Sequence, residues 1–212
     1  MEEKHIDSYK KLSVGKYLEL KEVVEDKEAD EYDKNIAIVS ILTGVDPVAI
    51  YNLPLDDFNR LLQLSAFLMK MPEQKVMETK YKVGKYTLIP IFGPGEMTTA
   101  QFIDYQTLIK DPETNMIQLL SIFLVPEDKS YNQGYSIEDV QEEIKDNLMI
   151  EDALALSSFF FLLLKAYVKA TLHSLERKMK KMKRKKMLTP EIEKKLKSQI
   201  QILEAAGDGL AL

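Results

Sequence analysis

The chain contains no cysteine, and this absence removes several kinds of chemistry at once. Without a thiol the protein has no cysteine nucleophile, no cysteine-ligated zinc site and no disulfide bond, a composition that fits a reducing compartment without requiring one. Histidine is almost as scarce, because His5 and His173 are the two in the chain and lie far apart in the sequence. A metal site with several histidine ligands is therefore excluded, and we expect no cofactor.

Long apolar runs are also missing. The most hydrophobic stretch covers residues 154–164, whereas a membrane-spanning helix needs about 20 apolar residues. The first five residues are acidic and lack the apolar core of a secretion signal, so we expect no membrane contact. The apolar stretch instead predicts a buried helix, whose large side chains lie within the subunit or in an interface: Phe159, Phe160, Leu163 and Tyr167.

The overall composition is typical of an ordinary soluble globular protein. Of the 212 residues, 45% are hydrophobic and 30% are charged, and the net charge is −5. A chain of this length can bury a real core as one domain or as two small ones.

Most of the sequence carries helix patterns with recognisable ends. These signals are N-cap residues and one C-terminal glycine: Ser13, Thr98 or Thr99, Ser136 and Thr189, and Gly44. The acidic residues 25–33 predict a solvated loop before a helix over residues 34–43. An apolar helix over residues 115–125 is expected to end at Pro126.

The chain changes character between the helical parts. Residues 76–81 and 85–90 alternate in the manner of strands and are joined by a tight turn that contains Gly84. A two-stranded hairpin is marginal by itself. We therefore expect it to pack on helices or to pair with a strand of another chain, which is a first indication of self-association.

Three short segments recur in the same order along the chain and indicate a duplicated helical unit. The echoes pair residues 12–20 with 97–105, 38–42 with 119–123, and 64–68 with 156–160. We expect a mainly α fold with two related helical units joined by a small β-hairpin, and a projecting basic C-terminal helix. The boundaries are residues 1–72 for the first unit, 73–95 for the connector, 96–172 for the second unit and 173–212 for the basic arm with an amphipathic C-terminal helix.

No catalytic constellation is visible in the sequence. Three acidic pairs are candidates for acid–base chemistry, but each lies near a predicted helix start or on an exposed face, where capping and solvation explain it: Asp56/Asp57, Glu142/Glu143 and Glu151/Asp152. Ser65, Ser157 and Ser158 lie inside apolar helices without a histidine close by in the sequence. We expect the protein not to be an enzyme.

The least ordinary feature is a basic arm that continues the long apolar helix. Eight of the eleven residues 176–186 are basic: Arg177, Lys178, Lys180, Lys181, Lys183, Arg184, Lys185 and Lys186. Since the whole chain is negative, the remainder is clearly acidic. Three hypotheses compete, namely a solvated spacer, phosphate contacts with nucleic acid, and docking to an acidic protein or to a neighbouring copy. No aromatic residues are interleaved for base stacking.

An amphipathic helix follows the arm. Its apolar residues repeat at spacings of three to four and form one narrow stripe: Ile192, Leu196, Ile200 and Leu203. We expect this stripe to contact a helix of a partner or of a sister subunit, while the arm orients the encounter.

One stretch resembles a known family. A strand-forming segment, residues 80–91, leads through a Gly/Pro turn into threonine, a small residue, glutamine, an aromatic residue, isoleucine and aspartate at residues 99–104. This order resembles the tail assembly chaperones and uncharacterised assembly proteins of tailed bacteriophages over residues 80–172, with a weaker echo upstream. The resemblance implies a helical, oligomerising protein that coats the tape-measure protein while the tail tube assembles. The doubled unit and the basic arm depart from the family's pattern.

The sequence therefore favours a non-enzymatic phage morphogenesis factor in the host cytoplasm. We expect it to be a tail assembly chaperone that forms homo-oligomers and binds a helical partner such as the tape-measure protein or another phage structural protein. One alternative is a virion component of the neck, connector or packaged-protein class. The other alternative is an accessory protein that binds nucleic acid through the basic arm.

Overall fold

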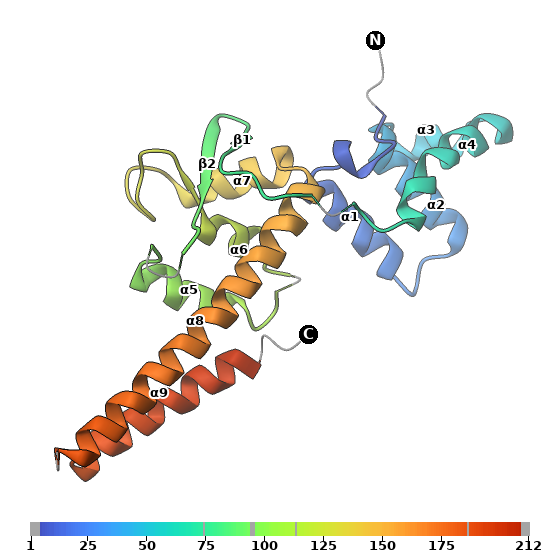
Figure 1. Ribbon diagram of the computed structural model, residues 1–212. Coiled ribbons are helices and arrows are strands. Elements are labelled where there is room, and N and C mark those ends of the chain that lie inside the picture. Colours follow the sequence, from blue (N-terminus) through green and yellow to red (C-terminus); the bar gives the residue numbers. More distant parts are fainter. Residues whose placement is uncertain (1–4, 74, 94–95, 113, 186, 209–212) are drawn as a thin grey trace. The chain divides into compact units, whose positions relative to one another are not determined.

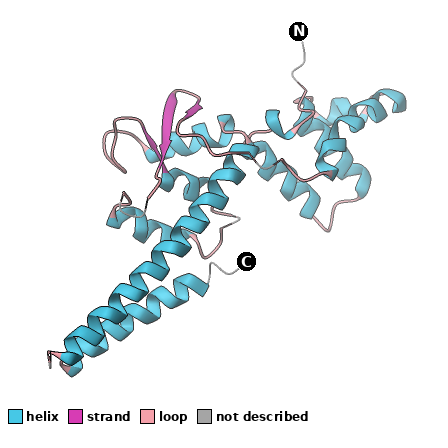
Figure 2. Ribbon diagram, viewed as in Figure 1, coloured by secondary structure: helices cyan, strands magenta, loops and turns pink. Residues whose placement is uncertain are grey.

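The computed structural model describes residues 5–73, 75–93, 96–112, 114–185 and 187–208, and helices make up most of them (Figures 1 and 2). Three short strands in this part of the chain form one sheet in the order β1-β2-β3. The predicted fold class, mainly α with a small β-hairpin, is confirmed.

The chain folds into two compact units, and each unit is built from two segments. Unit 1 contains Met1–Leu88 and Pro126–Ala155, and unit 2 contains Ile89–Val125 and Leu156–Leu212. This grouping differs from the consecutive segments expected from the sequence, because Pro126–Ala155 belongs with the N-terminal helices. The expected second helical unit is consequently divided between unit 1 and unit 2, and its relation to the first stays a prediction.

Unit 1 is built from mostly short helices. They are the 3₁₀ helices Tyr9–Lys11 and Gln63–Met69 and the α-helices α1 (Val14–Glu25), α2 (Glu31–Thr43), α3 (Pro47–Tyr51), α4 (Leu55–Leu62) and α7 (Ile137–Asn147). Side chains satisfy the free N–H groups at several helix starts. Ser13 accepts from Lys16 at the start of α1, and Ser136 accepts from Asp139 at the start of α7, so both predicted caps are confirmed.

The start of α2 differs from the prediction, whereas its end agrees with it. Gly44 ends the helix with φ +74°, as expected. The helix begins at Glu31 instead of residue 34, because the Asp30 carboxylate accepts from the backbone N–H groups of Tyr32 and Asp33. Part of the acidic run expected as a loop is therefore the first turn of a helix.

Two sets of helix contacts hold unit 1 together. One contains Ile36, Val39, Ile50 and Phe58 on α2, α3 and α4. The other forms where α1 packs on α7, and there a Cβ at Gly15 would lie 2.7 Å from Lys145 Cγ and 2.9 Å from its carbonyl oxygen. Glycine at this position therefore permits the close approach of α1 to α7.

The sheet pairs its hairpin with a third strand of the same chain. β1 (Tyr81–Val83) pairs antiparallel with β2 (Tyr86–Pro90), and Gly84 occupies the turn with φ +53°. β3 (Leu124–Pro126) is the third strand, so the apolar helix before it ends at Phe123 and not at Pro126. The hairpin is therefore stabilised within this chain and does not need a strand from another copy.

Unit 2 contains two short helices and two long ones. They are α5 (Thr99–Leu108), α6 (Met116–Phe123), α8 (Ile150–Arg184) from Leu156 onward, and α9 (Pro190–Asp208). Thr98 caps α5 in a reciprocal capping box with Gln101. The side chain of Gln101 is buried, and its Nε2 donates to the Ile122 carbonyl of α6 at 2.7 Å. This hydrogen bond fixes α5 against α6.

Aromatic rings form the centre of unit 2. Phe123 of α6 stacks on Phe160 of α8 with a centroid distance of 4.4 Å and an interplanar angle of 23°. Phe160 is buried as predicted, whereas Phe159 is half-buried and meets Phe92 edge-on. The side chains of Leu163 and Tyr167 lie outside the described residues.

The last two helices are joined by a five-residue connection. α8 continues without interruption from the apolar stretch into the basic arm, as expected, and α9 begins at Pro190 with Thr189 as its cap. So short a connection turns the chain back on itself. The buried Leu196 on α9 agrees with packing against the rest of unit 2.

Candidate functional site

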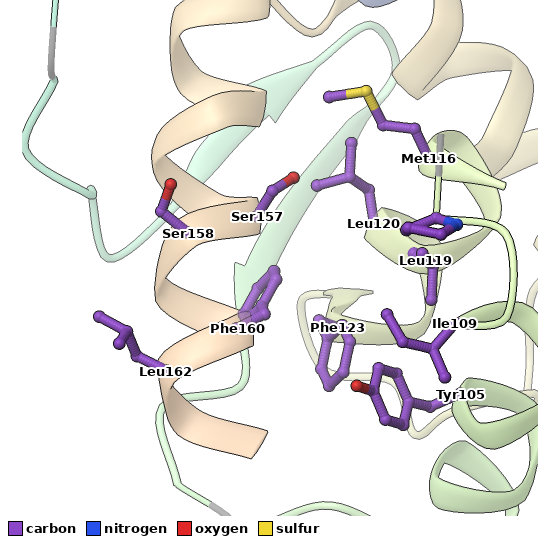
Figure 3. Close-up of a pocket in the computed structure, with 11 residues that line it drawn as sticks. Tyr105, Ile109, Met116, Leu119, Leu120, Phe123, Ser157, Ser158, Phe160 and Leu162 are labelled. Carbon is purple, nitrogen blue, oxygen red and sulfur yellow. The ribbon is translucent and has the colours of Figure 1, made fainter. Parts of the chain in front are cut away.

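An apolar groove in unit 2 is the best-formed candidate site. It has a volume of about 450 Å³ and lies between α5 and the following turn, α6, and α8 (Figure 3). Volumes of several hundred Å³ with an apolar lining are typical of ligand and peptide sites. Among the described residues that line it there is no Lys, Arg, Asp or Glu.

The floor of the groove is aromatic and closed. Phe123 and Phe160 are buried and stacked, and the Tyr105 ring meets Phe123 edge-on at 5.9 Å. Such aromatic pairs add stability beyond that expected from the apolar area that they bury. The floor is therefore a fixed surface in the free protein.

The rim is open and adaptable. Met116 and Leu119 of α6 are half-buried, and Leu162 of α8 is 66% exposed. Methionine fits irregular partner surfaces because its side chain is unbranched and flexible. The rim thus offers apolar contact area to a partner without needing to unfold.

Hydrogen bonds hold the two short helices that form one wall. Gln101 ties α5 to α6, as described above. Asn115 donates from Nδ2 to the Leu108 carbonyl at 3.0 Å and so satisfies the C-terminus of α5, while Thr114 N–H donates to the Asp111 carboxylate. These bonds fix the turn between the helices.

Tyr105 is the polar group of the floor. The residue is 3% exposed, and its hydroxyl has no hydrogen-bond partner among the described residues. Burial raises the pKa of this phenol well above its usual range. The hydroxyl oxygen is itself buried, and the hydroxyl stays protonated.

The basic arm is a separate surface of unit 2. Its described side chains are all exposed: Arg177, Lys178, Lys180, Lys181, Lys183, Arg184 and Lys185. Lys186 lies outside the described residues. Met179 and Met182 are half-buried between them, so the arm has one apolar side and one charged side.

The side chains of the predicted stripe on α9 differ in their exposure to solvent. Leu196 is 6% exposed and Ile200 is half-buried, whereas Ile192 is 37% exposed. The side chain of Leu203 lies outside the described residues. Leu196 is thus already covered within its own chain, and contact of the stripe with another chain stays a prediction.

Charge is divided unequally between the units. Unit 1 has 15 Lys and Arg against 25 Asp and Glu, and unit 2 has 14 against 9. The net charges are therefore −10 and +5. Unit 2, which carries the basic arm, is thus positive, and unit 1 is negative.

The acidic pairs do not come together as a site. Glu142 is exposed on α7, and Asp56 and Asp57 lie in the first turn of α4. Glu151 is buried at the start of α8, not solvated as expected, and Asp152 forms an ion pair with Lys75 at 2.6 Å. Within the described residues there is no group of three His, Cys, Asp or Glu that could hold a metal ion.

The sequence patterns do not predict the residues of the groove. A usable signal was present in α6, where Ile117 and Ile122 lie outside the stripe of Met116, Leu119, Leu120 and Phe123. A helix that is apolar around most of its circumference must be covered on more than one side. An open side of such a helix is a candidate binding surface.

Comparison of the chain with protein-family models, with curated proteins and with solved structures found no match. Among the described helices, none combines the length and the hydropathy that a bilayer crossing requires.

Proposed function

We propose that the protein is a non-enzymatic phage morphogenesis factor that binds an apolar helical segment of a partner in the groove of unit 2. The observation that carries the proposal is the groove itself, with a fixed aromatic floor and an open rim of Met116, Leu119 and Leu162. Helices bind in such grooves through apolar side chains at spacings of three, four and seven residues.

The proposed partner is a long helical protein of the phage tail, such as the tape-measure protein. Such a helix exposes apolar side chains until its binding surfaces are covered, and a chaperone can cover them during assembly. The resemblance of residues 80–172 to tail assembly chaperones supports this choice, since α5 and α6 lie in that range. We place the activity in the host cytoplasm.

The test places a charge on the rim of the groove. Leu162→Asp should lower capture of the co-expressed tape-measure protein about tenfold or more, because a carboxylate facing an apolar helix loses its hydration without a partner. Leu55→Asp is a matched control, since Leu55 is also a helical leucine that is 66% exposed but belongs to unit 1. Equal capture by the two variants would contradict the proposal.

Mass spectrometry of purified virions separates this function from a virion structural component. A chaperone is released before the particle is complete, so its peptides should be absent. Peptides in a fixed ratio to the neck or connector proteins would support the alternative.

A nucleic-acid function is the second candidate, and the exposure of the basic arm favours it. Seven described cations without an interleaved aromatic residue fit phosphate contacts and sequence-blind binding. Replacing them by Gln should then abolish DNA binding, and wild-type affinity should fall steeply between low and physiological salt. Under our proposal the same variant still captures the partner, at a lower association rate.

A further inference from the structure

We infer that the protein associates with itself head to tail, with the basic arm of one copy bound to an exposed aromatic and acidic surface on unit 1 of another copy. The receiving surface is formed by α2, α3 and α4, and the arm contributes residues 177–185 of α8. Neither surface includes the groove, so the inference goes beyond the proposed function. Three observations support it, concerning exposed apolar side chains, the charge around them, and the composition of the arm.

The first observation is a group of exposed apolar side chains on α2 and α3. The rings of Tyr32 and Tyr51 meet edge-on at 6.4 Å, yet the two residues are 47% and 63% exposed. Val48 lies one turn before Tyr51 on α3 and is 69% exposed. Tyr32 also contacts the ring of the buried Phe58 at 5.6 Å, which holds it in place. Apolar side chains that gather on a surface in this way are typical of a contact with another protein.

The second observation is the negative charge of the same three helices. Residues 30–62, which contain α2, α3 and α4, carry six Asp and Glu against two cations, Lys34 and Arg60. Lys34 lies 4.0 Å from the Glu31 carboxylate, and Arg60 lies 3.8 Å from that of Asp57. The two cations therefore leave four exposed carboxylates without a compensating charge: Asp30, Asp33, Asp46 and Asp56. Such a surface favours a positive partner.

The third observation is that the basic arm matches both properties. Residues 177–185 contain seven Lys and Arg, two Met, and no Asp or Glu, and all seven cations are exposed. Arg177, Lys181 and Arg184 are spaced by four and three residues, so they lie along one face over about 10 Å. Lys and Arg bind carboxylates and also the faces of tyrosine rings. Both the acidic and the aromatic parts of the receiving surface therefore have a counterpart on the arm.

A second copy is the partner that these charges indicate. Every chain carries a unit 1 of net charge −10 and a unit 2 of +5, so each copy offers one surface and accepts the other. Both surfaces are exposed in the single chain. Because the two surfaces differ, a dimer still has one of each free, and the contact leads to longer chains or to a ring.

Sedimentation velocity on the full-length, nuclease-treated protein tests the association. At low salt the wild type should form species larger than a dimer as the protein concentration rises. Raising the salt from about 50 mM to about 500 mM should increase the apparent Kd at least about tenfold, because salt screens charges on exposed surfaces. A wild type that stays monomeric at low salt overturns the inference.

Two triple variants each remove one surface and leave the helix caps intact. They are an arm variant and an α2–α4 variant: Arg177→Gln/Lys181→Gln/Arg184→Gln and Asp33→Asn/Tyr51→Ser/Asp56→Asn. Each variant alone should stay monomeric where the wild type associates. An equimolar mixture should form a dimer and grow no further, since each variant keeps one working surface. Two misfolded proteins could not give this dimer, and a mixture that stays monomeric contradicts the inference.

A matched control separates the α2–α4 surface from the total charge of unit 1. Glu142→Gln/Asp146→Asn removes two carboxylates that are exposed on α7, and it should associate as the wild type does. Loss of association in this control would show that net charge alone is responsible and would overturn the inference. So would association that occurs only before nuclease treatment, because the arm would then bind nucleic acid.

The groove proposal and this inference can fail separately. Leu162→Asp should associate with itself as the wild type does, whatever its capture of the partner. If its capture is normal while the mixture of triple variants forms the dimer, the proposed function is wrong and the head-to-tail contact stands.

Discussion

Unit 1 and unit 2 differ in how they satisfy their buried polar groups. In unit 1 the Tyr81 hydroxyl accepts a backbone N–H, and Asp152 forms an ion pair with Lys75. In unit 2 the Gln101 side chain accepts from Thr98 and donates to the Ile122 carbonyl, whereas the buried hydroxyl of Tyr105 has no partner in the described part of the chain. Unit 2 therefore retains a buried hydroxyl whose lost hydration no described group offsets.

The units also differ in what their aromatic rings do. In unit 1 Phe58 joins an aliphatic core on α2, α3 and α4. In unit 2 Phe123 and Phe160 stack to form both the core and the floor of the groove. A variant of unit 2 can therefore change stability and binding together, whereas a variant in the core of unit 1 should change stability alone.

The largest effect is expected from removing the aromatic floor. Phe160→Ala should cost about 3–5 kcal/mol in the free energy of unfolding, because a buried ring is deleted and its stacking partner Phe123 faces a cavity. Urea unfolding followed by circular dichroism measures this loss. Leu162→Ala, two residues further along α8 at a side chain that is 66% exposed, is the exposed control and should cost less than about 0.5 kcal/mol. A loss below about 1 kcal/mol for Phe160→Ala would show that unit 2 does not depend on the stack.

A smaller effect is expected where α1 meets α7 in unit 1. Gly15→Ala would place a Cβ 2.9 Å from the Lys145 carbonyl oxygen, so the two helices must move apart at a cost of about 1–3 kcal/mol. Urea unfolding again provides the measurement. Gly44→Ala serves as the contrast, because a Cβ there meets nothing within 4 Å and only the positive φ of +74° opposes it, at about 1–2 kcal/mol. If Gly15→Ala is neutral, the close approach of α1 and α7 is not required.

The smallest effect concerns the ion pair of unit 1. The hydrogen bond from Lys75 to Asp152 raises the pKa of Lys75, and the two side chains are 40% and 13% exposed. Because the folded-state pKa is the higher one, the stabilisation is complete below pH 10.5, the ordinary value for lysine, and is lost as the pH rises through the folded-state pKa. Solvent screening limits it to about 0.5 kcal/mol.

Lys75→Met isolates this contribution from the tyrosines, which titrate in the same alkaline range. The difference in unfolding free energy between wild type and Lys75→Met should be constant from about pH 6 to 9 and should shrink above about pH 10.5. A difference that grows with rising pH would have the wrong sign for a raised lysine pKa. No corresponding change is expected in the binding of partners by unit 2.

The ends of the helices were predictable from the sequence. Ser13, Thr98, Ser136 and Thr189 cap helices, and Gly44 ends one, as predicted. The reason is that a cap is a contact between residues two or three positions apart, so its chemistry is complete within a short window of sequence. The continuous helix from the apolar stretch into the basic arm was predictable on the same local grounds.

The sheet, the grouping of the chain into units and the groove depend on contacts between residues far apart in the sequence. Leu124–Pro126 became β3 because β2 offered a free edge, and strand pairing depends on residues far apart in the sequence. Pro126–Ala155 joined unit 1 because Gly15 lets α7 approach α1 closely. Tyr105, Phe123 and Phe160 come from three helices, and their local patterns could not show that they would meet around an open space. A groove exists only where packing stops, and that is a property of the assembled helices and not of any one segment.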